Sequence, residues 1–240
     1  MIRFLLALFL ILPSAMMACE TLTYKSNKYT LCEVTLTDNL RLFHSDAVGK
    51  LYGSFGQIND ALANENQALG FAMNAGMYHQ DRSPVGLFTE YGVQKNPLAD
   101  GGTYGNFGLK PNGVFCFGKD TFAVIETNAF RTLKPTCEFA TQSGPMLVID
   151  GKLHPRFLVN ATSHYIRNGV GVSADGTRAI FVISDTRVTF HEFGSLFRDH
   201  LKTPNALYFD GKVSRLYAPD LNRHDTGFPL GVVVGTVITD

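Results

Sequence analysis

Several features that define common protein classes are missing from this sequence. It has no Trp, its 21 Lys and Arg balance its 21 Asp and Glu, and charged residues make up only 18% of the chain. Binding to a nucleic acid or to an anionic membrane surface needs a concentrated cationic face. The balanced charge of this chain gives no sign of such a face. No apolar run approaches the roughly 20 residues of a membrane-spanning helix. We therefore expect neither a nucleic-acid partner nor a membrane span.

Familiar catalytic and metal motifs are also excluded by their spacing. Ser195 stands where a zinc-protease helix starting at His191-Glu192 would need its second histidine. Asp175 occupies the position where a nucleophile elbow requires glycine. The glycines near position 105 match neither a dinucleotide-binding loop nor a P-loop, and no Cys-x-x-Cys occurs. We expect no cofactor and no metal.

The amino terminus has the pattern of a secretory signal peptide over residues 1–18. Arg3 precedes a short apolar stretch that ends at Pro13, and cleavage after Ala18 would leave Cys19 first. The protein is therefore expected to be exported, either to the periplasm or by secretion. Lipid anchoring through Cys19 is the weaker alternative, because it would leave Cys32 without a partner.

Four cysteines in an oxidising compartment can form two disulfides in three ways. We expect the pairings nearest in sequence, Cys19–Cys32 and Cys116–Cys137. Each would contribute about 2–4 kcal/mol, chiefly by restricting the unfolded chain.

Residues 19–240 read as one domain, because no linker, charge block or repeat divides them. The 19 Phe predict a Phe-rich core, and the 23 Gly predict many tight turns. Apolar residues recur at helical spacing over residues 58–69, and Thr189 and Glu192 form a capping box that predicts a second helix, ending before Pro204. About ten strands surround these helices. The fold class expected is α+β, a strand-rich mixed sheet with two main helices packed on it.

Two Asp-Gly dipeptides follow predicted strands and favour type I′ hairpin turns. They are Asp150-Gly151, after residues 146–149, and Asp175-Gly176, after residues 170–173.

Four short polar motifs lie at predicted strand ends, where a rigid sheet can present polar groups to a ligand. They are Asn74-Ala75-Gly76-Met77-Tyr78, Ser143-Gly144-Pro145, Arg167-Asn168-Gly169-Val170-Gly171 and Asp210-Gly211-Lys212-Val213-Ser214.

Each motif also has an ordinary structural explanation. Asp210-Gly211 could be another hairpin turn, and Asn74 could cap a turn through its own backbone. Ser143 could be a loop hydroxyl, and Arg167 could be a surface cation.

The order and spacing of the four motifs resemble the phosphodiester glycosidase family. The resemblance runs from about residue 71 to residue 234. Ala75, Met77 and Lys212 depart from the family pattern, which puts the choice of substrate in doubt more than activity.

The resemblance implies cleavage at an anomeric carbon whose leaving group is a phosphate monoester. Arg167 would hold the phosphate with its planar guanidinium, and Asp210 would act as base or nucleophile, with Asn74 completing the catalytic set. Asp185 is the candidate for a second carboxylate, because Glu192 has a structural role in the capping box. The remaining substrate-binding candidates are Ser143, Gly144, Gly76, Ser214, Gly211 and His79.

The function expected is an exported hydrolase that cleaves a sugar-1-phosphodiester, such as one of N-acetylglucosamine, in envelope or exopolysaccharide material. Two other classes remain open. A non-catalytic glycan-binding protein for exopolysaccharide assembly would bind sugars without cutting them. A phosphodiesterase that cuts at phosphorus usually recruits metal ions, for which clustered carboxylates and histidines are scarce in this sequence.

Overall fold

The computed structural model describes residues 19–100 and 105–239. The expected signal peptide lies outside the described residues. The strands are β1 (Cys19–Tyr24), β2 (Asn27–Thr35), β3 (Leu40–Phe43), β4 (Gln67–Asn74), β5 (Phe88–Glu90), β6 (Val93–Asn96), β7 (Gly113–Phe117), β8 (Phe122–Glu126), β9 (Phe139–Ser143), β10 (Met146–Ile149), β11 (Lys152–Leu153), β12 (Asn168–Val172), β13 (Arg178–Ser184), β14 (Asn205–Asp210), β15 (Leu216–Ala218), β16 (Arg223–His224) and β17 (Val233–Thr239). The α-helices are α1 (Phe55–Ala63), α2 (Thr127–Leu133) and α3 (Phe190–Ser195). Two short 3₁₀-helices, η1 (Asn106–Gly108) and η3 (Pro219–Leu221), and one π-helical segment, η2 (Leu196–His200), complete the helical elements of the described residues.

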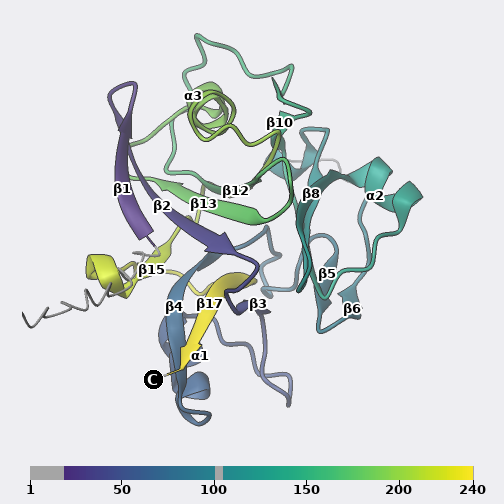
Figure 1. The fold of residues 1–240 in the computed structure, drawn as a ribbon, viewed down its shortest axis with the longest axis vertical. Helices are drawn as coiled ribbons and strands as arrows, with labels where there is room; N and C mark the ends of the chain where they lie inside the picture. The colour runs from purple at the N-terminus through teal and green to yellow at the C-terminus, as the bar shows by residue number, and fades with distance from the viewer. Residues whose placement is uncertain (1–18, 101–104, 240) are drawn as a thin grey trace, which may run out of the picture.

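The strands form three antiparallel sheets. The first sheet has the order β1-β2-β13-β12-β14-β10-β11, the second β16-β15-β4-β17-β3 and the third β6-β5-β9-β7-β8. The strand-rich α+β class is therefore confirmed, with three antiparallel sheets in the place of one mixed sheet. Figure 1 shows α3 over the first sheet, α1 beside β4 and β17, and α2 next to β8.

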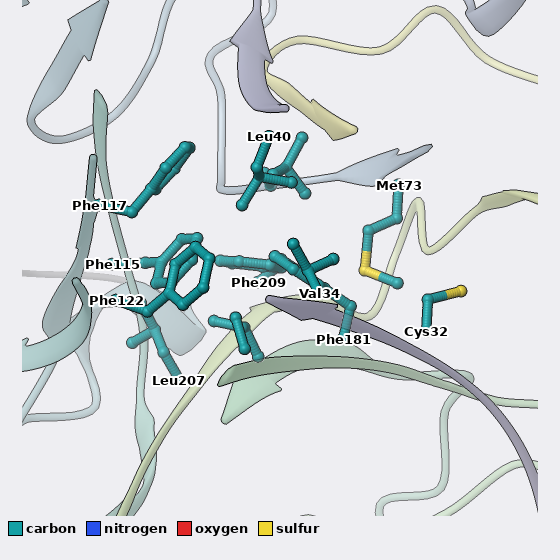
Figure 2. Close-up of a cluster of buried hydrophobic side chains, with 14 of the residues drawn as sticks. Cys32, Val34, Leu40, Met73, Phe115, Phe117, Phe122, Phe181, Leu207 and Phe209 are labelled. Carbon is teal, nitrogen blue, oxygen red and sulfur yellow. The ribbon is translucent and has the colours of Figure 1, made fainter. Parts of the chain in front are cut away.

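One Phe-rich core lies where the three sheets meet. Phe181 and Phe209 come from the first sheet and Phe71 from the second, while Phe115 and Phe117 come from the third, and all five are buried. Their rings contact one another, and Phe115 alone lies within 6.5 Å of four other Phe rings (Figure 2). A core shared by all three sheets makes the described chain one domain.

Two disulfides link neighbouring strands and segments as expected. Cys19–Cys32 joins β1 to β2 at a directly opposed pair, and Cys116–Cys137 joins β7 to the segment before β9. Both pairings predicted from sequence proximity are confirmed. None of the helices in the described ranges is long and apolar enough to cross a bilayer.

The helix predictions are right in position and inexact in length. The capping box is present, because the Thr189 hydroxyl accepts from the Glu192 amide and the Glu192 carboxylate accepts from the Thr189 amide. The helix predicted over residues 58–69 instead spans Phe55–Ala63, capped by Ser54, and Leu69 belongs to β4. A turn with Asn66 at φ 54° separates α1 from β4. Leu69 lies at helical spacing from the apolar residues of α1 only by coincidence, which made the predicted helix too long at its carboxyl end.

The two expected hairpin turns differ from each other. Asp150 and Gly151 both have positive φ, 46° and 76°, as a type I′ turn requires. At the second turn only Gly176 has positive φ, 71°, while the Asp175 carboxylate accepts from Ser173 and Thr177. The type I′ expectation is therefore wrong there, because Asp175 uses its side chain to close a longer turn.

Candidate active site

A cleft of about 1110 Å³ lies beside the end of β14. Residues of four chain segments line it, within 77–85, 105–107, 210–213 and 228–229, together with Ala99. Asp210 is the carboxylate in this lining, and the cationic side chains are Arg82, Lys212 and, when protonated, His79. The cleft therefore combines one acid with several potential anion-binding groups.

The Asp210 carboxylate is held in place by the backbone that follows it. Its Oδ1 atom accepts hydrogen bonds from the amides of Gly211 at 2.6 Å and Lys212 at 2.8 Å. Burial raises the pKa of Asp210, and these backbone bonds oppose the rise. The carboxylate is thus a fixed group and a stronger base than an exposed aspartate.

Asn168 connects Asp210 to Asn74 across two sheets. Its Oδ1 atom accepts from the Asp210 amide at 3.1 Å and from the Ser214 hydroxyl at 3.2 Å. Its Nδ2 atom donates to the Asn74 carbonyl at 2.7 Å and to Asn74 Oδ1 at 3.1 Å. Asn168 begins β12 in the first sheet and Asn74 ends β4 in the second, so one side chain joins the ends of both strands.

The hydrogen-bond network also fixes the orientation of both amides. A backbone N–H can only donate, so the atom of Asn168 facing the Asp210 amide must be oxygen. The Arg215 amide, at 2.9 Å, identifies Asn74 Oδ1 in the same way. Asn74 Nδ2 then remains a buried donor without a partner among the described residues. Such a group costs about 1–3 kcal/mol unless a ligand or water binds it. Asn74 itself is fully buried and is not among the residues that line the cleft.

Tyr208 lies directly behind the Asp210-Gly211 dipeptide. A Cβ atom on Gly211 would lie 2.1 Å from the Tyr208 hydroxyl, so only glycine fits there. Gly211 has no positive φ, and β14 and β15 belong to different sheets. The dipeptide is therefore not a hairpin turn, and its glycine is required by Tyr208.

Arg167 is buried and its guanidinium donates to the protein itself. The residue is 1% exposed, with Nε 2.9 Å from the Val188 carbonyl and Nη2 3.0 Å from the Ser163 carbonyl. Nη1 lies 3.5 Å from the Tyr208 hydroxyl, and the guanidinium carbon lies 3.7 Å from the centre of the Phe190 ring. Arg167 does not line the cleft; it supports Tyr208 from behind.

Most of the other predicted residues serve as connections around the site. The Ser143 hydroxyl donates to the Phe209 carbonyl at 2.9 Å, which ties the end of β9 to β14. Gly144 packs against Asn112, where a Cβ would lie 2.5 Å from that side chain. Gly76, at φ 140°, packs against Thr141.

Ser214 and Asp185 lie on the far side of the Asn168 bridge. Ser214 donates within the loop, with its hydroxyl 2.6 Å from the Asp210 carbonyl. Both residues line a separate cavity of about 530 Å³, where Asp185 pairs with Arg223 at 2.6 Å. Of the predicted residues, the structure places Asp210 and His79 on the cleft, joins Asn74 and Ser214 to Asp210, and places Asp185 elsewhere.

Sequence reasoning assigned no role to Asn168, Tyr208, Tyr78 or Arg82. Asn168 had one signal, since a buried amide at the start of an otherwise apolar strand needs partners. Tyr78 lines the cleft, and its hydroxyl donates to the Pro229 carbonyl at 3.0 Å. Burial and then the charge of Asp210 raise the pKa of Tyr78, which places that hydroxyl within the electrostatic reach of the carboxylate. No group of three or more metal-ligating side chains is found in the described part of the chain.

Comparison with known proteins places these features in a family. The chain is 34% identical over 181 residues to an uncharacterised protein of Escherichia coli K12, YigE, covering 75% of this chain and 70% of that protein. Its fold is similar to the catalytic domain of zebrafish N-acetylglucosamine-1-phosphodiester alpha-N-acetylglucosaminidase, which is auto-inhibited by its pro-peptide, with a TM-score of 0.60, 12% identity and coverage of 93% and 84% of the two chains. A hypothetical protein of Synechocystis is also similar, with a TM-score of 0.55, 12% identity and coverage of 92% and 61%. The family model for phosphodiester glycosidase matches residues 68–236, the range that carries Asn74, Asn168 and Asp210, and the chain therefore belongs to the phosphodiester glycosidase family.

Proposed function

We propose that this protein is an exported glycosidase that hydrolyses a sugar-1-phosphodiester, such as one of N-acetylglucosamine, in envelope or exopolysaccharide material. The observation that carries the proposal is the fixed carboxylate of Asp210 on the wall of a substrate-sized cleft, bonded through Asn168 to Asn74. The two disulfides support export, because such bonds persist in oxidising compartments.

In the proposed reaction Asp210 acts as a general base. It removes a proton from a water molecule whose oxygen attacks the anomeric carbon. The bond between that carbon and the phosphate oxygen breaks, and its electron pair leaves with the phosphate. The products are a free sugar and a phosphomonoester. The leaving group is a weak base, so the reaction places little demand on a general acid, and the burial that raises the pKa of Asp210 strengthens the base.

Hydrolysis in ¹⁸O-labelled water distinguishes this reaction from attack at phosphorus. We expect mature protein to release free sugar and a phosphomonoester that carries no label, and Asp210→Asn to release neither. A labelled phosphomonoester would show a phosphodiesterase.

A non-catalytic glycan-binding protein is the second candidate. It is favoured by the position of Arg167, which does not line the cleft and whose guanidinium donates to two backbone carbonyls. Binding of sugar phosphodiesters without any turnover, measured by calorimetry and by product analysis on the same preparation, would establish that alternative.

A further inference from the structure

An aromatic side chain at the cleft is exposed on a loop that is firmly held. Phe228 lines the cleft and is 80% exposed. Its own carbonyl accepts from the Arg215 guanidinium, and the next carbonyl, of Pro229, accepts from Tyr78. The Leu230 amide then donates to Gly53 at 2.8 Å. The backbone that carries the exposed ring is thus fixed at the cleft, and the ring counts as part of a ligand site where it continues an apolar pocket wall.

The cleft continues this apolar surface on several segments. The residues that share its apolar character are Met77, Val85, Phe107, Val213 and Pro229. They come from parts of the chain more than 120 residues apart, so the wall is a product of the tertiary fold and not of one hydrophobic segment. A cleft for polar ligands alone would gain little from such a wall.

Two permanent cations line the same cleft. Neither Arg82 nor Lys212 forms a salt bridge with any carboxylate in the ranges 19–100 and 105–239. Arg82 has a fixed backbone, since its amide donates to the His79 carbonyl at 2.8 Å and its carbonyl lies 2.9 Å from His44 Nε2. Its guanidinium lies against Gly53, where a Cβ would be 2.5 Å from Nη1. With Asp210 as the carboxylate, the lining carries a net positive charge in a neutral chain.

We infer that the cleft binds a sugar-1-phosphodiester whose other substituent, the aglycone, is apolar, with the phosphate at Arg82 and Lys212 and the aglycone on the Phe228 wall. The inference rests on the proposed function and adds the substrate class to it. Lys212 and Asp210 line the same cleft, and the Lys212 amide donates to Asp210 Oδ1 at 2.8 Å, so a phosphate bound by this cation would hold the adjacent anomeric carbon on the side of the carboxylate. An apolar substituent on the phosphate then has the ring of Phe228 and its apolar neighbours to bury against.

Two substrates that differ only in the aglycone test this assignment. One is N-acetylglucosamine-1-phosphate esterified with methanol, the other with octanol and used below its micellar concentration. We expect kcat/KM for the octyl ester to be at least about tenfold higher, because each buried methylene contributes favourably. Phe228→Ala should remove most of that preference, lowering kcat/KM for the octyl ester much more than for the methyl ester. Tyr91→Ala changes an exposed aromatic residue of a different cavity and serves as the matched control.

The cations are tested on the same pair of esters. Lys212→Met and Arg82→Met should each raise KM for both esters about tenfold, with a weaker dependence on salt than the unaltered protein shows. Unchanged KM in both variants would overturn the phosphate assignment.

The outcomes for the aglycone are separable from those for the proposed function. Equal kcat/KM for the two esters, or an equal loss of both in Phe228→Ala, would overturn the inference, while their hydrolysis would keep the proposed function. If neither ester is cut, the proposed function fails. Calorimetric binding of both esters to Asp210→Asn then decides the inference, with tighter binding of the octyl ester supporting it and equal binding overturning it.

Discussion

Asn168 donates from its side-chain amide to the backbone carbonyl of Asn74 at 2.7 Å, which joins the start of β12 to the end of β4. The same amide accepts from Asp210 on its other side. All three residues lie at strand ends, since Asn74 ends β4, Asn168 begins β12 and Asp210 ends β14. The candidate site is therefore an extension of the two sheets, and its geometry depends on one buried side chain.

Replacing Asn168 should damage both stability and turnover. Asn168→Ala leaves the Asn74 carbonyl and the Asp210 amide without these partners, and we expect a loss of about 2–4 kcal/mol in the free energy of unfolding. Turnover should fall more than KM rises, because Asp210 would lose its position. Urea unfolding and steady-state kinetics check this, with Asn64→Ala, an exposed residue just after α1, as the control. A variant of normal stability would contradict the bridging role.

Removing the charge of Asp210 should lower turnover strongly and stabilise the fold. Burial raises the pKa of Asp210 in the folded protein, so its ionised form is disfavoured there. Ionisation of Asp210 therefore destabilises the fold. This destabilisation is zero at pH values below the pKa of the unfolded state and reaches its full size above the pKa of the folded state. Asp210→Asn should therefore have a higher Tm at pH 7, with a difference that disappears in acid, and a kcat lower by about 10²–10⁴-fold. Calorimetry at several pH values and kinetics measure both.

The raised pKa of Asp210 also predicts the pH dependence of the reaction. A general base must be ionised, so kcat/KM should fall as pH drops through this pKa. The acid limb should lie above the usual value for aspartate, about 3.9. A limb at or below that value would contradict the role of Asp210 as a buried base.

Local patterns in the sequence predicted the parts of the fold that depend on neighbouring residues. The Thr189–Glu192 capping box and the Asp150-Gly151 turn are formed by residues no more than three positions apart, and both are present. The Cys19–Cys32 pair was predictable because the strands of one hairpin lie side by side. The end of α1 was not predictable, because Leu69 has the spacing of a helix and the partners of a strand.

The features of the candidate site that the sequence did not predict depend on contacts between residues far apart in the chain. The Asn168–Asn74 bond spans 94 positions, and no local pattern predicts it. Arginine is usually exposed, yet Arg167 is buried because two carbonyls and the Phe190 ring surround it. Similarly, the glycine of Asp210-Gly211 suggested a turn, while its real constraint is the hydroxyl of Tyr208.

Arg167→Lys should lower stability more than it alters recognition of phosphate. Lysine carries its charge on one nitrogen and cannot reach the Val188 and Ser163 carbonyls together while it stacks on Phe190. We expect a loss of about 3 kcal/mol in the free energy of unfolding. Arg187→Lys, an exposed arginine just before α3, is the matched control. Normal unfolding together with a large rise in KM would instead support a direct phosphate contact by Arg167.

Gly211 and Tyr208 should show a strong coupling in a double-mutant cycle. Gly211→Ala places a methyl group where the Tyr208 hydroxyl lies, so the ring or the loop must move, at a cost of about 1–3 kcal/mol and with a lower kcat. Tyr208→Phe removes the hydroxyl and takes an acceptor from Arg167 and Asn106. In the double variant the methyl group has room, so its destabilisation should be smaller than the sum of the two single effects. Denaturant unfolding of all four proteins measures the coupling, and strictly additive effects would show that the hydroxyl does not impose the glycine.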